Sequence, residues 1–305
     1  MGAQETPPLA VNRCTSMALE ARVTVPMLAR RKAKGRPIVV VTAYDAPQGR
    51  LADTAGVDAI LVGDSLGMVV LGYDTTLPVT LDDVLHHTRA VARGMAARDG
   101  CPDAAPTPED ATRGARHALL IADMPFGSYG VSVPDSVRSA HRLIAEGGAQ
   151  AVKLEGGAAL APTIRAITDI GIPVMGHLGM TPQFVHRFGG FKLQGKTDEA
   201  AGVLLADAQA LVEAGVFGMV LEVIPAALAR RITEAVPVPT IGIGAGAACD
   251  GQVQVLHDLV GLGDDGPVLK HARRYAEAGQ VIRDALAAYT EDVRAGRFPT
   301  EENSF

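Results

Sequence analysis

Eight short aliphatic or β-branched runs recur along the chain, and most are followed by a polar turn and an alanine-rich helical pattern. The runs span residues 38–43, 59–64, 118–123, 150–155, 173–177, 218–222, 240–244 and, more weakly, 253–258. Short apolar strands that alternate with helices indicate parallel strands buried on both faces. Eight such units within about 230 residues predict a closed α/β barrel, a (β/α)8 TIM barrel, with an open doubly wound sheet as the alternative.

The segments outside these units divide the rest of the chain. Residues 1–25 have no clear period and are predicted to form a flexible N-terminal arm, which leaves 26–305 as a single barrel domain. A short helix is expected just before the first strand, ending at Gly35. A stretch near 95–116 rich in Pro, Ala and Asp precedes the third strand, so we expect a surface insertion without a catalytic role. From Pro267 onward the pattern predicts helices packed outside the barrel.

Composition and charge narrow the function classes. The chain is 48% hydrophobic, which supplies a large core, and its net charge of −6 gives no general reason to bind nucleic acid. No apolar run reaches the roughly 18 residues of a membrane-spanning helix. Cys14, Cys101 and Cys249 are widely spaced, which argues against a zinc ribbon or a disulfide framework. Because the first residues also lack a secretory apolar run, we expect a cytoplasmic protein.

Charged residues stand where several of the predicted strands end. These residues are Asp64, Asp123, Lys153, Glu155 and Glu222. The active site of a barrel is built at the carboxyl ends of its strands. Buried charges are costly unless they are paired or bind a metal, so packing alone does not account for this group. Strand alternation predicts two inward ladders, Ile60 and Val62 leading to Asp64, and Leu119 and Ile121 leading to Asp123.

The types of these side chains suggest the chemistry. Several hard oxygen ligands around one point indicate Mg²⁺, and no cluster of His and Cys of the zinc type accompanies them. His177 ends the fifth strand and is typical of an oriented histidine that faces a core or a substrate. Lys153 has two interpretations, an ion pair with an anionic substrate or a Schiff base. Glu155, two residues away, should keep Lys153 charged, which favours the ion pair.

Two glycine-rich segments have open interpretations. Residues 242–251 follow the seventh strand, where barrels often bind phosphate through backbone N–H groups, and a plain tight turn is equally compatible with them. Residues 187–196 lie in the long loop after the fifth strand. Their Gly pair, Phe and Lys residues suit a mobile lid, with an irregular loop as the alternative.

Eight motifs occur in an order that resembles one known family. They are VTAYDAPQGRLAD, ILVGDSLGMVVLGYDTTLPVTLDD, ADMPFGSYG, AVKLEGG, GHLGMTPQ, GGFKLQGK, LEVIP and IGIGAGAACDGQ. From about residue 25 to the C-terminus the chain resembles the ketopantoate hydroxymethyltransferase (3-methyl-2-oxobutanoate hydroxymethyltransferase) family. The resemblance implies a TIM barrel of the phosphoenolpyruvate/pyruvate type, a divalent metal, usually Mg²⁺, and 5,10-methylenetetrahydrofolate as co-substrate. It also implies a cytoplasmic homo-oligomer, in many members a homodecamer.

The resemblance also implies roles for single residues. Asp64, Asp123 and Glu155 match the metal-binding carboxylates of the family. Asp64, Ser65, Asp123 and Lys153 match its positions that bind the 2-oxo acid substrate, with Lys153 as the cation. Glu222 matches the proton acceptor. His177, which ends the fifth predicted strand, and Tyr44, which follows the first, are further candidates.

These roles combine into one expected reaction. The 2-oxo acid chelates the metal, Glu222 removes the C3 proton, and the resulting enolate, stabilised by the metal, attacks the methylene carbon of the folate. Burial can raise the pKa of a glutamate toward neutrality, which suits a base. Another Mg²⁺-dependent aldol or lyase reaction on a small 2-oxo acid is the main alternative. A non-catalytic ligand-binding barrel is the third.

Overall fold

The computed structural model describes residues 23–96, 118–263 and 269–305. Most of the predicted N-terminal arm and most of the insertion near 95–116 therefore lie outside the described residues. The short helix expected before the first strand is present as α1 (Val25–Ala33), which is followed by Gly35 in a left-handed conformation with a φ of 60°.

The eight strands form a closed barrel in chain order, so the barrel prediction is confirmed and the open sheet is excluded. Every neighbouring pair is parallel, and β8 pairs with β1 to close the ring. The strands are β1 (Ile38–Thr42), β2 (Ala59–Val62), β3 (Leu119–Asp123), β4 (Ala151–Lys153), β5 (Val174–Gly179), β6 (Gly218–Glu222), β7 (Thr240–Ile243) and β8 (Gly251–Gln254).

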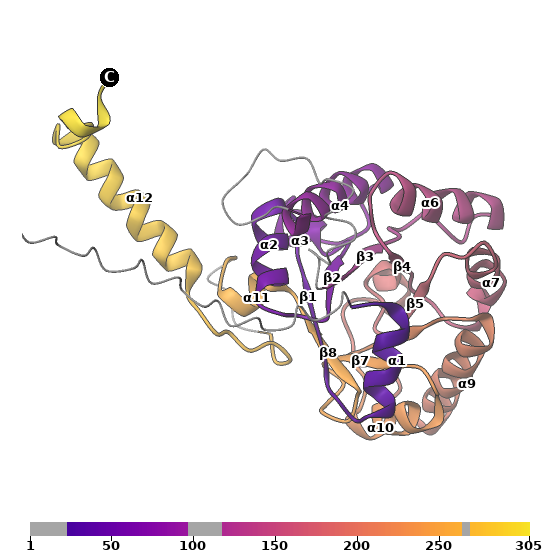
Figure 1. The fold of residues 1–305 in the computed structure, drawn as a ribbon. Coiled ribbons are helices and arrows are strands. Elements are labelled where there is room, and N and C mark those ends of the chain that lie inside the picture. The colour runs from indigo at the N-terminus through magenta and orange to yellow at the C-terminus, as the bar shows by residue number, and fades with distance from the viewer. Residues whose placement is uncertain (1–22, 97–117, 264–268) are drawn as a thin grey trace, which may run out of the picture.

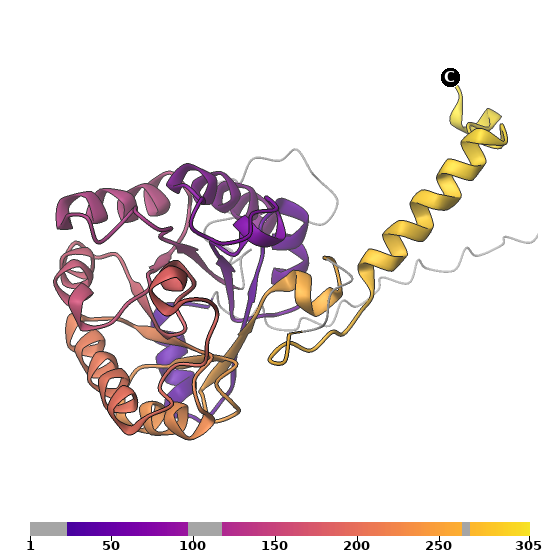
Figure 2. The same cartoon turned by 180° about the vertical axis from the view of Figure 1, so that it is seen from behind.

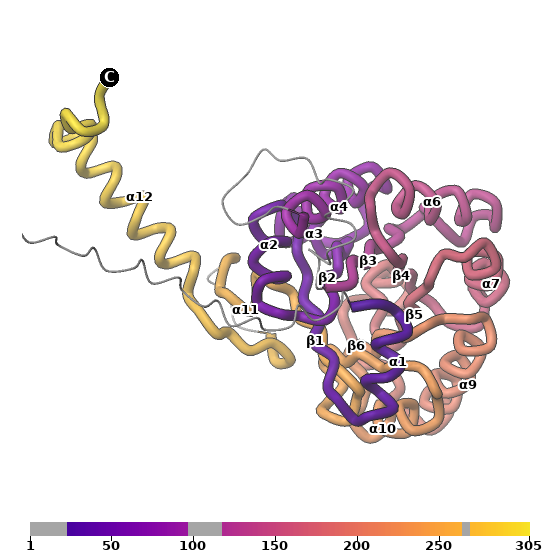
Figure 3. The backbone as a smooth tube through the Cα atoms, in the orientation of Figure 1, coloured from indigo at the N-terminus to yellow at the C-terminus, as the bar shows by residue number. Residues whose placement is uncertain are grey.

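Helices surround the strands, as the ring in Figures 1 and 3 shows. The surrounding helices are α2 (Ala46–Thr54), α3 (Leu66–Val69), α4 (Leu81–Ala96), α6 (Val133–Ala145), α7 (Ala161–Asp169), α9 (Asp198–Ala214) and α10 (Ala226–Ala235). The remaining elements are α8 (Val185–Phe188), α11 (Leu256–Val260), α12 (Ala278–Arg294) and the 3₁₀ turns η1 (Ala158–Leu160), η2 (Pro182–Phe184) and η3 (Glu301–Asn303). Asp45, Ser132 and Thr197 begin α2, α6 and α9, because each side chain accepts a hydrogen bond from a first-turn backbone N–H.

Side chains alternate along each strand between the barrel interior and the layer beneath the helices. One buried cluster draws on all eight strands and fills the interior, with Ile38, Val40, Ala59, Leu61, Leu119, Ile121, Ala151, Met175, Val220, Ile241 and Val253. The other cluster joins the outward residues to the helices. The predicted ladder of Leu119 and Ile121 is confirmed, whereas that of Ile60 and Val62 is wrong, because both face the helices and Leu61 faces the interior.

The N-terminal helix closes one end of this interior. Leu28 of α1 is 1% exposed and belongs to the interior cluster, together with Val23 just before the helix. Figure 1 shows α1 lying across that end of the barrel, and Figure 2 views the barrel from the opposite side. The salt bridge of Arg31 with the buried Asp58 and the hydrogen bond of Lys32 to Asp250 fasten the helix to the strand starts.

The eighth unit differs from its prediction. β8 covers residues 251–254 rather than 253–258, because Ile38 donates its backbone N–H to the carbonyl oxygen of Asp250 and so fixes the register earlier. The Thr42 hydroxyl then accepts the backbone N–H of Leu256, where the short α11 begins. With only five residues in α11, the outward side chain of Val39 on β1 stays 52% exposed.

The C-terminal helix is the largest departure from the predicted fold. We expected this part of the chain to pack on the barrel, but α12 has no buried residue and projects away from it in both Figures 1 and 2. Backbone hydrogen bonds from Tyr275 to Leu259 and from Gly279 to Gly261 anchor only its beginning. Within the described ranges, no helix combines the length and the apolar character needed to cross a bilayer.

Candidate active site

The predicted charged residues meet at the carboxyl ends of the strands. Asp64, Asp123, Lys153 and Glu155 are each buried, with exposed fractions of 4% or less. Glu222 ends β6 and keeps 18% of its side chain exposed. In a ring of eight strands β2 and β6 lie opposite each other, so Glu222 approaches the site from the side that faces Asp64.

Lys153 is surrounded by carboxylates. Its Nζ lies 2.9 Å from Oδ1 of Asp123 and 3.8 Å from Oε1 of Glu155. Burial by itself would lower the pKa of Lys153, but Asp123, Glu155 and Asp64 raise it above its usual range. A lysine held in the charged form is a poor nucleophile, so the geometry favours the ion-pair interpretation over the Schiff base.

His177 joins the two glutamates of the site. Its Nδ1 lies 3.3 Å from Oε1 of Glu155, and its Nε2 lies 3.2 Å from Oε2 of Glu222. Burial and the nearby Lys153 lower the pKa of His177, yet Glu155 and Glu222 outweigh them and raise it to about 9. The ring lies between the two carboxylates, and its contact with Glu222 is an ion pair without a hydrogen bond at Nε2.

The two aspartates occupy adjacent strand ends. The Asp64 backbone N–H donates to Oδ2 of Asp123 at 3.0 Å. Gly63 makes this approach possible, because a Cβ there would lie 2.8 Å from Oγ of Ser65 and 3.4 Å from Asp123. Burial, with Glu155 and Asp123, raises the pKa of Asp64 well above its usual range. Burial likewise raises the pKa of Asp123, although Lys153 opposes it.

The oxygen atoms of this site fit a divalent cation in part. Oδ1 of Asp123 is buried, and within the described residues it makes an ion pair with Lys153 at 2.9 Å but no hydrogen bond. Across the described parts of the chain, no three His, Cys, Asp or Glu side chains are grouped as a ready-made metal site. Glu155 is turned instead toward Lys153 and His177. Two aspartates remain, which is the protein contribution that Mg²⁺ commonly uses, with water and substrate completing its shell.

Ser65 and Tyr44 lie beside the aspartates. The Tyr44 hydroxyl is 2.8 Å from Oγ of Ser65, and Tyr44 is 1% exposed. Burial raises the pKa of Tyr44 above its usual range, so its hydroxyl stays protonated. Ser65 is only partly buried, which leaves its hydroxyl within reach of a ligand.

Sequence reasoning missed two buried residues of this site, Gln183 and Tyr129. The Gln183 side chain donates to Oδ2 of Asp64 at 2.8 Å, and its carbonyl oxygen accepts the Tyr129 hydroxyl at 2.6 Å. Both residues lie in motifs that carried the family resemblance, GHLGMTPQ and ADMPFGSYG. A polar residue after the strand end in each motif was therefore the available signal.

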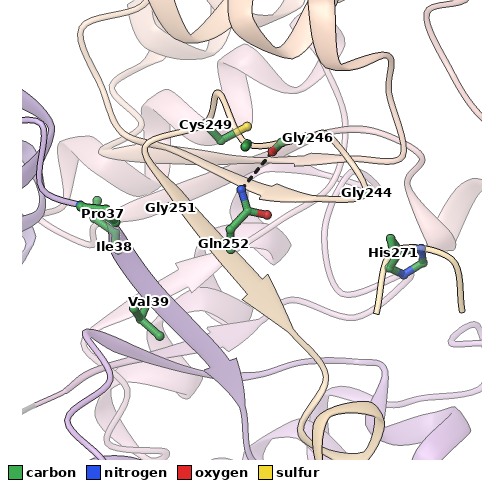
Figure 4. Close-up of a pocket in the computed structure, with 10 residues that line it drawn as sticks. Pro37, Ile38, Val39, Gly244, Gly246, Cys249, Gly251, Gln252 and His271 are labelled. Atoms are coloured by element: carbon green, nitrogen blue, oxygen red, sulfur yellow. Dashed lines mark hydrogen bonds between the residues drawn. The ribbon is translucent and has the colours of Figure 1, made fainter. Parts of the chain in front are cut away.

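The two glycine-rich segments take different positions. The turn at 244–250 borders a cavity of about 530 Å³ on the outside of β1, β7 and β8, where Gln252 donates to the Gly246 carbonyl (Figure 4). None of the site residues lines this cavity. In the other segment, the backbone N–H of Gln194 donates to the carbonyl oxygen of Val223, next to Glu222. Neither the anion nest nor the mobile lid is tested by these contacts.

Val223 has an unusual backbone conformation for its residue type. Its φ is 47°, in the left-handed region that a β-branched residue rarely adopts. Hydrogen bonds on both sides of its peptide hold it there, from Val223 to Ile243 and from Gln194 to Val223. Such strain tends to occur where surrounding structure fixes a functional side chain, and Val223 follows Glu222, the residue predicted to be the base.

Sequence comparison shows that this chain belongs to one family. The family model described as "Ketopantoate hydroxymethyltransferase" matches residues 22–100 and 106–301. A "3-methyl-2-oxobutanoate hydroxymethyltransferase" from Moorella thermoacetica is 55% identical over 289 residues, which cover 95% of this chain and 100% of the relative. A relative of the same name from Heliobacterium modesticaldum is 50% identical and covers 93% of this chain and 95% of its own.

Solved structures give the fold relationship. A phosphonopyruvate hydrolase, in complex with oxalate and Mg²⁺, aligns with a TM-score of 0.53 at 14% identity and covers 92% of both chains. A 2,3-dimethylmalate lyase, described as a member of the PEP mutase/isocitrate lyase superfamily, aligns with a TM-score of 0.52 at 16% identity, covering 92% of this chain and 91% of its own. These likenesses confirm the TIM-barrel fold.

Proposed function

The chain belongs to the ketopantoate hydroxymethyltransferase family, and on that premise we propose that it transfers a hydroxymethyl group from 5,10-methylenetetrahydrofolate to 3-methyl-2-oxobutanoate. The product is 2-dehydropantoate, a precursor of pantothenate. The observation that carries the proposal is the meeting, at one barrel end, of a buried cation at Lys153, two aspartates, and Glu222 on the opposite strand. A barrel that only bound a ligand would not need both a metal site and a separate base.

Asp64 and Asp123 would hold the divalent metal, which we take to be Mg²⁺. Oδ1 of Asp123 makes an ion pair with Lys153 but no hydrogen bond, and this and the surplus of buried carboxylates over cations both support a metal at this point. When bound, the metal would supply Lewis-acid polarisation of the 2-oxo group. Glu155, matched to a metal-binding position of the family, is assigned here to an outer role, since it contacts Lys153 and His177.

Lys153 and Ser65 would bind the carboxylate of the oxo acid. A charged ammonium in a buried setting attracts an anion strongly, because little water screens it. The Tyr44 hydroxyl lies 2.8 Å from Oγ of Ser65, so it orients the serine hydroxyl that a substrate carboxylate would accept. These side chains would bind the substrate through its carboxylate and leave C3 free to react.

Glu222 would accept the proton from C3. His177 lies 3.2 Å from it and is itself paired with Glu155, and part of the Glu222 side chain stays exposed. In the overall reaction the C3–H bond and both methylene–nitrogen bonds of the folate break. A new carbon–carbon bond forms at C3, water supplies the hydroxyl oxygen, and the folate nitrogens take up the two protons.

An assay of the whole chain with 3-methyl-2-oxobutanoate, 5,10-methylenetetrahydrofolate and Mg²⁺ tests the proposal. We expect 2-dehydropantoate, identified by mass spectrometry, in amounts that equal the tetrahydrofolate released. Cleavage or condensation of 2-oxo acids without folate would indicate the lyase alternative. Binding of the oxo acid with no turnover under any of these conditions would indicate a ligand-binding barrel.

Self-association into a homodecamer and a cytoplasmic location complete the proposal, and both are based on the family. An uncovered apolar surface supports self-association. Four residues spaced along one face of α12, here called the α12 stripe, are Ile282, Leu286, Tyr289 and Val293, with exposed fractions of 47%, 59%, 55% and 45%.

Light scattering after size-exclusion chromatography tests self-association. Leu286→Glu places a charge in the α12 stripe and should reduce the measured mass toward that of one chain. Val203→Glu changes an equally exposed valine on α9 and serves as the matched control, because it should leave the mass unchanged. A single-chain mass for the unaltered protein would contradict the proposal.

A further inference from the structure

Gln183 lies on η2, immediately beyond β5, and its side chain is 4% exposed. Both N–H groups and the carbonyl oxygen of its amide make hydrogen bonds. The nitrogen donates to Oδ2 of Asp64 at 2.8 Å and to the carbonyl oxygen of Met124 at 3.0 Å, and the oxygen accepts the hydroxyl of Tyr129 at 2.6 Å. The opposite amide orientation would set its oxygen against two acceptors, so the arrangement has one orientation.

The same residue also reaches the neighbouring glutamate. The backbone N–H of Gln183 donates to Oε2 of Glu155 at 3.0 Å. Tyr129 adds to this contact, because its hydroxyl oxygen accepts the backbone N–H of Glu155 at 3.0 Å. Gln183 therefore binds two carboxylates that come from the ends of β2 and β4, and Tyr129 supports it from the loop after β3.

These contacts give the two oxygens of each carboxylate different partners. Oδ2 of Asp64 is occupied by the amide, and among the described residues no hydrogen bond engages its Oδ1. Oε2 of Glu155 is occupied by the Gln183 backbone, and its Oε1 faces Lys153 at 3.8 Å and His177 at 3.3 Å. One free oxygen of Asp64 is left for a cation, and Glu155 is kept turned toward the lysine and the histidine.

We infer that Gln183 is a positioning residue that assigns the two carboxylates to different tasks, Asp64 to the divalent cation and Glu155 to the Lys153–His177 pair. This inference rests on the proposed function of the site. Only an amide meets both requirements at this position, since two donors and one acceptor are needed at once. Glutamate would offer no N–H to Asp64, and methionine would fill the space without either donor or acceptor.

The test measures the binding of Mg²⁺ by calorimetry, with 3-methyl-2-oxobutanoate present, in the whole unaltered chain and in Gln183→Met. Loss of a group that orients a metal ligand typically weakens metal binding by about 10–100-fold. We expect the dissociation constant for Mg²⁺ to rise by that factor, together with a fall in kcat. Gln209→Met, a similar change on the exposed face of α9, is the control and should leave both quantities unchanged.

The melting temperature separates positioning from a role in folding alone. A merely structural Gln183 would lower the melting temperature of Gln183→Met and leave the dissociation constant of Mg²⁺ as it was, which would overturn the inference. Gln183→Glu serves as a second comparison, because it preserves size but not the donors. It should weaken Mg²⁺ binding at least as much as Gln183→Met, and recovery of normal binding in this variant would also overturn the inference.

If the Gln183 variants do not fold, Tyr129→Phe tests the same inference. It removes the hydroxyl that holds the Gln183 amide and also accepts the Glu155 backbone N–H, and we expect it to weaken Mg²⁺ binding at least about threefold. An unchanged dissociation constant would overturn the inference. If the unaltered chain forms product but Gln183→Met binds Mg²⁺ normally, the inference alone fails. If the unaltered chain forms no product and Gln183→Met still loses Mg²⁺ affinity, only the proposed function fails.

Discussion

The two ends of the barrel interior come from the same eight strands but contain opposite kinds of residue. At the amino ends of the strands the interior is filled by aliphatic side chains and closed by Leu28 of α1. At the carboxyl ends, a few residues further along the same strands, it contains Asp123, Lys153, Glu155 and His177, all buried. In β3 the change takes place between Ile121 and Asp123.

The difference shows how the stability and the chemistry of this fold are separated in space. The closed end gains stability from apolar burial, which needs no partner of a given type. The end at the carboxyl ends of the strands contains charges whose burial costs free energy unless each is paired. Each polar atom there depends on a particular neighbour. Substitutions should therefore affect turnover at one end and stability at the other.

Loss of either aspartate should have the largest effect on turnover. Asp64→Ala and Asp123→Ala each remove one of the two ligands proposed for Mg²⁺, and we expect turnover to fall by at least about 10⁴-fold, or roughly 5 kcal/mol of activation free energy. Calorimetric titration with Mg²⁺ and the oxo acid measures the cause. Asp82→Ala, an exposed aspartate on α4, is the control. Normal Mg²⁺ binding in both active-site variants would refute the assignment.

Glu222→Gln should have the next largest effect. The substitution keeps the shape and removes the basicity, so Mg²⁺ and oxo-acid binding should persist while turnover falls by roughly 10²–10⁴-fold. Exchange of the C3 proton of the oxo acid with deuterated water, followed by NMR without folate, reports the step directly. Glu213→Gln on α9 provides the comparison. Were the Glu222 variant to exchange that proton at the normal rate, another group would be the base.

Lys153→Ala should affect substrate binding more than the chemical step. A charged hydrogen bond contributes about 1.5–3 kcal/mol, so we expect KM for the oxo acid to rise by about 10–100-fold. Lys34→Ala, an exposed lysine after α1, should leave KM unchanged. Treatment of the unaltered enzyme with borohydride and the oxo acid should give no adduct. A mass increase on the Lys153 peptide would instead establish the Schiff base.

Leu28→Ala should have the smallest effect on turnover and a large one on stability. Truncation of a fully buried leucine costs about 2–5 kcal/mol of unfolding free energy. Because Leu28 lies at the closed end, kcat measured below the melting temperature should stay within about twofold. Leu51→Ala on α2, where the leucine is 67% exposed, should change neither quantity. A large fall in kcat without loss of stability would show that the two ends are not independent.

The sequence correctly predicted that these charged residues lie at the carboxyl ends of the strands, because each stands at or just after the end of an apolar run. The alternation of side chains along a strand predicted less reliably which residues face the barrel interior. Ala59 and Leu61 face inward, so Asp64 does not continue the inward set of β2 but reaches the site from the turn after Gly63. Alternation applies only while the backbone remains extended, and the pattern of residues does not mark where that ends.

Two other features, the loop residues of the site and the position of α12, could not be predicted from the local pattern of hydrophobic and polar residues. Gln183 and Tyr129 lie in loops, whose paths are set by contacts with distant strands. The apolar face of α12 gives the same sequence signal whether it packs on its own barrel or remains uncovered. Local periodicity predicts that a helix forms and which face is apolar, but not what that face contacts.

The closed ring of strands also limits how copies of this chain can meet. Since β8 pairs with β1, every strand has a neighbour on both sides, and no row of backbone N–H and C=O groups is left free. Strand addition, the route by which exposed sheet edges recruit other chains into aggregates, is therefore unavailable to the folded barrel. Contacts between barrels must be made by side chains of helices and loops, so single substitutions on α12 can alter assembly without changing the β-sheet.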